Sequence, residues 1–225
     1  MDYDEIIHRL ESIANPEAVR GMASYGIATA SAYGVSIPSL RALAKEIGRS
    51  HDLAQRLWTN DNRETRILAA LVDDPKQVDE AQVERWARDF DNWEVCDQCC
   101  LNLLQKTSFA CAKAVEWSAA VPEFVKRAGF VLMACLAVSD KQAPDERFET
   151  FFPFIVREST DGRPYVKKAV NWALRQIGKR NRRLNERAIQ IAEEIRTSDS
   201  SAARWIAADA LRELKSEAVQ ARLRP

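Results

Sequence analysis

The chain has 225 residues, and its 33 basic and 33 acidic residues give a formal net charge of zero. This length can bury a sizeable core without disulfide or metal staples, and it suffices for one large domain or a repeat array. Nothing resembles a cleavable signal, and charges interrupt every apolar run well before the ~20 residues that a bilayer requires. These features argue against a membrane-spanning or disulfide-stapled secreted protein, and we expect a soluble, cytoplasmic protein.

The composition and the apolar periodicity predict helices. Gly and Pro are sparse, at 7 and 8 residues, and no convincing alternating strand pattern occurs. The first helix is expected over 2–12, and Pro16 can occupy the first turn of a second helix that ends near Tyr25 and Gly26. The irregular segment 31–38 follows, and its Pro38 opens the next helix. Further helices are predicted over 39–47, 51–58, 62–72, 76–90, 92–106, 108–119, 121–138, 144–157, 163–179, 183–196 and 200–213.

The predicted helix near the middle of the chain combines an acid with an indole. Asp91 or Asn92 can cap its start. Trp93 and Asp97 are four residues apart, so they lie one above the other on a helix, and Leu101 continues the same apolar stripe. A carboxylate therefore lies on an apolar face beside an indole.

The cysteines fall inside apolar helical patterns, and their odd number argues for reduced thiols. The run from Cys96 to Cys100 invites a metal interpretation. These thiols share one helix, however, and His8 and His51 lie far off in polar contexts, so a tetrahedral site is hard to assemble. We expect small core hydrophobes and no metal or cofactor. The five residues are Cys96, Cys99, Cys100, Cys111 and Cys135.

The charges are unevenly distributed along the chain. Residues 161–225 hold 15 Lys and Arg against 8 Asp and Glu, while residues 1–160 hold 18 against 25. Such asymmetry suits a protein that offers one cationic surface to a polyanion. A solvated helical surface gives a similar pattern, so both interpretations stay open.

A repeat emerges when the second helices of successive predicted pairs are aligned. Each has a cation followed by an apolar block, with Arg66, Arg127, Lys168 and Arg204 in register and Asp97 at the central position. The steps of 31, 30, 41 and 36 residues are helical-hairpin repeat lengths. In an α-solenoid (superhelix) these positions line one concave cationic groove, with the acid inside it. Alternatively, the cations cap or bridge neighbouring repeats.

Motifs in a fixed order point to a family. They are Met22-Ala-Ser-Tyr25, Tyr33-Gly34-Val35 with Pro38 and Arg41, Trp93-x-x-x-Asp97, Phe124-Val-Lys-Arg127-Ala, and Tyr165-Val-Lys-Lys168-Ala-Val with Trp172 and Arg175. Over nearly the whole chain the sequence resembles the bacterial alkylpurine DNA glycosylases of the AlkD type. The resemblance implies a single HEAT-like repeat domain over 1–225, which can act as a monomer. It also implies hydrolysis of the N-glycosidic bond of N3- or N7-alkylated purines in double-stranded DNA, without the base flipping common among base-acting enzymes.

The resemblance also implies roles for individual residues. Asp97 resembles the catalytic carboxylate, and Trp93 and Trp172 resemble the indoles that flank the sugar and phosphate of the damaged nucleotide. The sequence departs from the family pattern at three places: Cys96 precedes Asp97 where an aliphatic residue is common, Gly26 follows Tyr25 where a larger residue is expected, and the turn around Tyr33 is a variant. The expected DNA-binding residues are Arg127 as a phosphate ligand, Tyr25 facing the lesion, and Arg175 and Lys168 at the backbone.

The expected chemistry fits this set of residues. An alkylated purine is already cationic and leaves as a neutral base, so the enzyme has to stabilise an oxocarbenium-like sugar and needs no general acid. The carboxylate of Asp97 and the faces of Trp93 and Trp172 can do this. Several alternatives remain: the tryptophans are core residues, Asp97 pairs with Arg66 or Arg127, or the chain is a non-catalytic HEAT-like scaffold that binds DNA or a protein.

Overall fold

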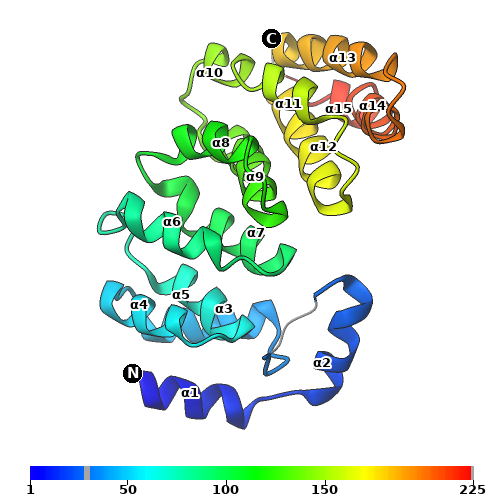
Figure 1. The fold of residues 1–225 in the computed structure, drawn as a ribbon. Coiled ribbons are helices and arrows are strands. Elements are labelled where there is room, and N and C mark those ends of the chain that lie inside the picture. The colour runs from blue at the N-terminus through cyan, green and yellow to red at the C-terminus, as the bar shows by residue number, and fades with distance from the viewer. Residues whose placement is uncertain (28–30, 224–225) are drawn as a thin grey trace. The chain divides into compact units, whose positions relative to one another are not determined.

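The computed structural model describes residues 1–27 and 31–223, and throughout these ranges the regular elements are helices (Figure 1). The chain divides into two compact units, residues 1–108 (unit 1) and 109–225 (unit 2). The all-α expectation is confirmed. The expectation of one repeat domain over 1–225 stays a prediction, as does the concave cationic groove. No helix in the described ranges is long and apolar enough to cross a membrane.

Unit 1 begins with two short helices and continues with helical pairs. Polar N-cap side chains open its helices: Ser36, for example, accepts from the backbone N–H of Ser39 at 3.3 Å and so fixes the helix start at the Pro38 signal. The helices are α1 (Tyr3–Ser12), α2 (Pro16–Met22), α3 (Ile37–Ile47), α4 (His51–Thr59), α5 (Arg63–Val72), α6 (Glu80–Arg88) and α7 (Trp93–Asn102), with 3-10 turns η1 (Ala23–Tyr25) and η2 (Leu104–Lys106).

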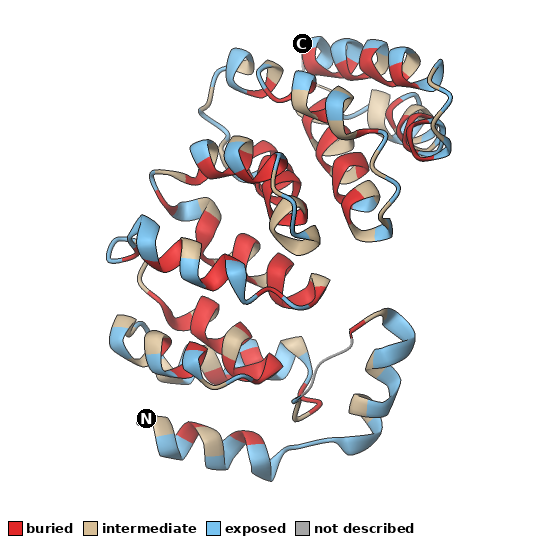
Figure 2. Cartoon of the chain, in the orientation of Figure 1, coloured by how far each residue is buried: buried red, intermediate tan, exposed pale blue. Residues whose placement is uncertain are grey.

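The core of unit 1 is built by the second helices of its pairs. Helix α5 is almost entirely buried and packs against α3, α4 and α7. The first helices α4 and α6 are joined by the rings of Trp58 and Trp86, which stack in parallel with centroids 4.0 Å apart. Figure 2 shows the buried residues gathered on α5 and α7, whereas α2 buries no residue.

Unit 2 continues the pattern of helical pairs. Its second helices pack in series, α9 on α12 and α12 on α14, and Gly129 allows α8 to approach α9 closely. A Cβ at Gly129 would lie 2.6 Å from the backbone nitrogen of Ser118. The helices are α8 (Ala110–Ser118), α9 (Glu123–Ser139), α10 (Asp145–Glu149), α11 (Phe152–Glu158), α12 (Pro164–Gly178), α13 (Arg182–Arg196), α14 (Ser201–Leu214) and α15 (Glu217–Gln220).

The predicted helices are largely confirmed, with a few corrections. The helix expected over 76–90 begins at Glu80, because Asp79 caps it by accepting from the backbone N–H of Gln82 at 2.7 Å. The helix expected over 144–157 is split into α10 and α11, since Pro153 has no N–H to continue a helical ladder. The helix expected over 92–106 ends at Asn102, and α15 was not predicted.

Candidate functional site

Helix α7 carries the acid and the indole that the sequence singles out. Its cap is Asn92, whose side chain accepts from the backbone N–H groups of Glu94 and Val95, both at 3.0 Å. Trp93 is half-buried, and Asp97, four residues on, is only 7 % exposed. The predicted pairing of an indole with a largely desolvated carboxylate on one helical face is therefore present.

The indole of Trp93 is fixed to the N-terminal segment. Its Nε1–H donates to the backbone carbonyl of Tyr25 at 3.0 Å. Gly26 follows with φ +72° and ψ +24°, a left-handed conformation that ends η1 and that glycine adopts without strain. Tyr25 is 75 % exposed, so its backbone is held in unit 1 while its ring faces solvent. The glycine that departs from the family pattern thus has a conformational reason here.

A buried carboxylate holds the irregular segment before α3. Glu64, fully buried, accepts from the backbone N–H groups of Tyr33, Gly34 and Val35 at 2.9, 2.9 and 3.1 Å. Successive N–H groups of this kind form a concave anion site in the backbone. Gly34 has φ +76°, and a Cβ there would lie 2.2 Å from the carbonyl oxygen of Asn15. The Tyr33-Gly34-Val35 motif therefore has a structural role in unit 1.

Arg63 connects this segment to the start of α7. Its Nη1 lies 2.6 Å from an oxygen of Glu64 and its Nε lies 2.6 Å from an oxygen of Glu94. Burial alone would lower the pKa of Arg63, but the hydrogen bond and charge of Glu94, together with Glu64, raise it. The guanidinium therefore stays charged inside unit 1 and links α5 to the first turn of α7, one residue after Trp93.

Sequence reasoning missed this network. Charged residues in the first turn of a helix are ordinarily solvated, and Arg63, Glu64 and Glu94 all occupy such positions. The available signal was an Asn cap followed two residues later by Glu, at two helix starts that are 30 residues apart, which is a repeat length. That pattern identifies equivalent helix starts and does not indicate burial.

The cysteines pack as the sequence predicts. Cys96, Cys99, Cys100 and Cys135 are buried and Cys111 is half-buried. Burial raises the pKa of the Cys99 thiol well above its usual value, so the thiol is un-ionised at neutral pH and chemically inert. Within the described residues, no group of three or more His, Cys, Asp or Glu side chains is placed to hold a metal ion.

The predicted repeat register coincides with the helices. Arg66, Asp97, Arg127, Lys168 and Arg204 each occupy the fourth or fifth residue of a second helix, in α5, α7, α9, α12 and α14 respectively. The register is therefore confirmed by the helix boundaries, and Asp97 is the acidic member of an otherwise cationic series.

The contacts of Arg66 and Arg127 favour the bridging interpretation of this series. The Nη2 of Arg66 lies 2.8 Å from Asp61, and its Nη1 donates to the carbonyl of Asp89 at 3.1 Å, just before α7. Arg127 is 7 % exposed, and its Nη1 donates to the carbonyl of Tyr165 at 2.7 Å, joining α9 to α12. Both guanidinium groups therefore join successive repeats.

The other DNA-binding candidates of unit 2 differ in accessibility. Arg175 bridges α12 to α14, with its Nη1 2.7 Å from Asp209 and its Nε against Glu213. Lys168 is exposed, and Trp172 is half-buried one turn farther along α12. Tyr25, Trp93 and Asp97 lie in unit 1, whereas Arg127, Lys168, Trp172 and Arg175 lie in unit 2. The roles of all these residues stay predictions.

Comparison with known proteins places the chain in a family. The model of the DNA alkylation repair enzyme family matches residues 6–217. The chain belongs to this family. No curated protein sequence matches it. The family match covers both units, from α1 to the start of α15.

A solved structure supports the fold. One similar structure is described as a new family of proteins related to the HEAT-like repeat DNA glycosylases, with affinity for branched DNA structures. It is 23 % identical, has a TM-score of 0.75, and the match covers 95 % of each chain. An engineered protein matches at 16 % identity and a TM-score of 0.41, over 79 % of this chain and 91 % of that one. The first likeness establishes a HEAT-like repeat fold for this family member.

Proposed function

We propose that this protein is a DNA glycosylase that hydrolyses the N-glycosidic bond of cationic N3- or N7-alkylated purines in duplex DNA, with Asp97 as its catalytic carboxylate. The observation that carries the proposal is the pairing on α7 of a 7 % exposed carboxylate with an indole anchored to the carbonyl of Tyr25. Membership of the DNA alkylation repair enzyme family supports alkylated DNA as the substrate class.

The proposed reaction needs charge stabilisation more than proton transfer. The bond from C1′ to the purine nitrogen breaks, and its electron pair leaves with the base, which becomes neutral. The sugar acquires oxocarbenium character, and a carboxylate of low exposure stabilises that positive charge more strongly than one in water. A water molecule then adds its oxygen to C1′ and loses a proton to solvent. In this scheme Asp97 orients the water and the indole of Trp93 faces the developing cation.

A carboxylate-to-amide substitution tests the chemistry with little change of shape. We expect the wild-type protein to release 7-methylguanine and 3-methyladenine from methylated duplex DNA. Asp97→Asn should lower the release rate by on the order of 100-fold, because it removes the negative charge that stabilises the transition state. Duplex affinity should stay near that of the wild type, and circular dichroism checks that the variant is folded.

The control is Asp52→Asn, which removes an exposed carboxylate from the first turn of α4. It should release base at the wild-type rate. Equal release by Asp97→Asn and the wild type would remove Asp97 from the mechanism. Duplex binding without base release by any of the proteins would contradict the glycosylase.

The second candidate is a HEAT-like scaffold that binds DNA without catalysis. The interhelical contacts of Arg127 and Arg175 favour it. Both side chains were predicted to hold the phosphate backbone, and in the structure their guanidinium groups bind neighbouring helices. A similar solved protein is described as having affinity for branched DNA structures. Tighter binding to a four-way junction than to a duplex, with no base release, would support this candidate.

A further inference from the structure

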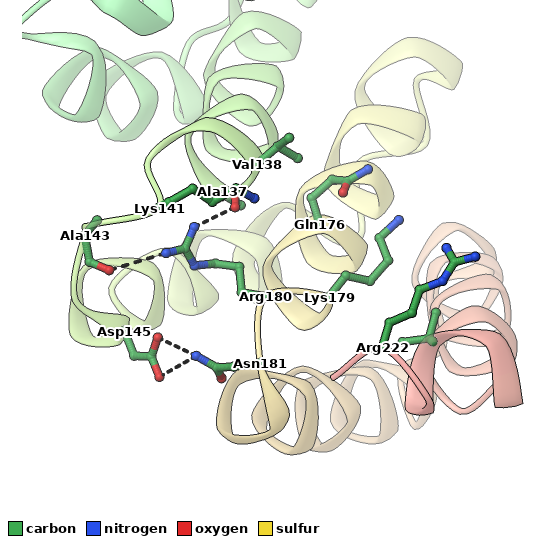
Figure 3. A pocket seen from close by; sticks show the side chains of 11 residues that line it. Ala137, Val138, Lys141, Ala143, Asp145, Gln176, Lys179, Arg180, Asn181 and Arg222 are labelled. Atoms are coloured by element: carbon green, nitrogen blue, oxygen red, sulfur yellow. Dashed lines mark hydrogen bonds between the residues drawn. The ribbon is translucent and has the colours of Figure 1, made fainter. Parts of the chain in front are cut away.

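Unit 2 contains a cleft that the proposed reaction does not use. Its volume is about 750 Å³, and it lies where the C-terminal ends of α9 and α12 meet α10 and α15 (Figure 3). Clefts of this size accommodate a small molecule or a short stretch of a polymer. The ionisable side chains that line it are Lys141, Asp145, Lys179, Arg180 and Arg222.

The lining of this cleft is strongly cationic. It holds four basic side chains and one carboxylate, and that carboxylate, Asp145, accepts from the side-chain amide of Asn181 at 2.8 and 2.9 Å. Lys179 is paired with Glu213 at 2.6 Å. Lys141 and Arg222 are exposed, and within the described ranges neither side chain makes an ion pair. At least two positive charges are therefore available to an anion.

Arg180 lines the cleft, and several contacts hold its guanidinium group in place. Its Nη1 donates to the carbonyl of Ala137 at 2.6 Å, its Nη2 donates to the carbonyl of Ala143 at 3.3 Å, and its guanidinium carbon lies 3.9 Å from the ring centroid of Phe148. Its Nε is buried and has no hydrogen-bond partner in the described structure. Partial burial lowers the pKa of this guanidinium, but an arginine so far above neutral pH stays charged.

Capping of helix ends explains only part of this arrangement. Arg180 satisfies the carbonyl of Ala137 near the end of α9, as cations commonly do at helix C-termini. That role does not require Lys141 and Arg222, which come from a loop and from the end of the described chain, to line the same cleft. Figure 3 shows Lys179 and Arg222 extending on one side of Arg180, away from the carbonyls that Arg180 binds.

We propose that this cleft binds backbone phosphates of DNA, as a second contact separate from the residues proposed for catalysis. A cluster of Lys and Arg side chains in one cleft binds phosphodiesters, and it does so without reading the base sequence. Unit 2 as a whole holds 21 basic against 15 acidic residues, which favours a polyanion over an isolated small anion. The inference rests on the proposed function only for the choice of DNA as ligand.

The test removes the two exposed cations together. Lys141→Ala with Arg222→Ala should weaken binding to an undamaged duplex about tenfold and reduce the slope of log K against log salt by about two, because two phosphate contacts are lost. The charge-matched control is Arg85→Ala with Arg88→Ala, which removes two exposed cations from α6. The control should reduce the slope of log K against log salt by less than one. An equal change in both double variants would overturn the cleft proposal.

A second measurement separates a DNA backbone from a free phosphate. Amide shifts of Arg180 and Asn181 are followed by NMR during titration with the duplex and, separately, with inorganic pyrophosphate. Shifts with the duplex support the proposal. Shifts with pyrophosphate alone would make the cleft a small-phosphate site and overturn it.

Base release separates this inference from the proposed function. At saturating DNA the cleft variant should release alkylated bases at the wild-type rate. If the wild type releases no base while the cleft variant still loses duplex affinity, the glycosylase proposal fails and the cleft proposal stands.

Discussion

The two units differ in how they use charge. Unit 1 holds 12 basic and 18 acidic residues, and its ion pairs include a buried set centred on Arg63. Unit 2 holds 21 basic and 15 acidic residues, and many of its ion pairs are at least partly open to solvent, such as Arg183 with Glu146. Removing the partner of a buried charge is strongly destabilising, whereas an exposed ion pair contributes little to the free energy of unfolding. The stability of unit 1 should therefore fall most when a buried charge is removed. The stability of unit 2 should depend more on the close packing between its helices.

The largest effect is expected at the buried charge network of unit 1. Glu64→Gln removes the anion from the backbone N–H groups of Tyr33, Gly34 and Val35 and leaves Arg63 with one carboxylate fewer. The free energy of unfolding of unit 1 should fall by about 3 kcal/mol. Hydrogen exchange, followed by mass spectrometry, should show faster exchange across α3, α5 and the start of α7.

The matched control for this change is Glu46→Gln, at an exposed position of α3. It should change the unfolding free energy by less than about 0.5 kcal/mol. If Glu64→Gln were equally mild, the network would not stabilise unit 1, and the contrast between the two units would fail.

An intermediate effect is expected where α8 crosses α9 in unit 2. Gly129→Ala places a Cβ 2.6 Å from the backbone nitrogen of Ser118 and 2.9 Å from the carbonyl oxygen of Ala114, so two helices must separate. Overpacking of this kind should cost about 2 kcal/mol. The control Gly21→Ala in α2 meets no atom within 4 Å and should instead gain about 0.5 kcal/mol from helix propensity. Urea unfolding of both variants measures the difference, and a stabilised Gly129→Ala would disprove the close approach.

The smallest effect is expected at a partly exposed ion pair of unit 2. The guanidinium of Arg163 lowers the pKa of Asp161 to about 2, below the ~3.9 of an unfolded chain. The resulting stability is present above about pH 4 and is lost as the pH falls toward 2. Asp161→Asn should therefore cost about 1 kcal/mol at pH 7, after allowance for solvent screening.

Thermal unfolding at several pH values tests this dependence. The difference between Asp161→Asn and the wild type should shrink between pH 4 and pH 2. The exposed Asp199→Asn should show no such trend, since the structure gives its carboxylate no ion pair within the described ranges. A difference in thermal midpoint that stays constant with pH would show that the charge of Asp161 does not stabilise unit 2.

Sequence alone predicts the helices and their repeat well, because the signals are local. Asn92, one of the two predicted cap residues, caps α7, and the register of Arg66, Asp97 and Arg127 coincides with equivalent helix positions. The errors are also local: Pro153 divides a predicted helix, and α15 is too short to show periodicity.

The contacts between repeats are beyond local prediction. Nothing in the segment around Glu64 indicates that it binds backbone groups 29 to 31 residues earlier. Likewise, nothing in the segment around Trp93 indicates that its N–H donates to the carbonyl of Tyr25. Tertiary partners of this kind depend on which helix faces meet, and a single sequence does not encode them in any short motif.

The hydrogen bond between Trp93 and Tyr25 has a practical consequence. It joins positions 68 residues apart, yet α2, which leads into η1, buries no residue. A segment with so little apolar contact opens at a lower free energy than the unit as a whole. Opening would expose the indole N–H to water and alter its emission. The chain has five other tryptophans, so the difference in emission between the wild type and Trp93→Phe is what reports whether the N-terminal segment is docked.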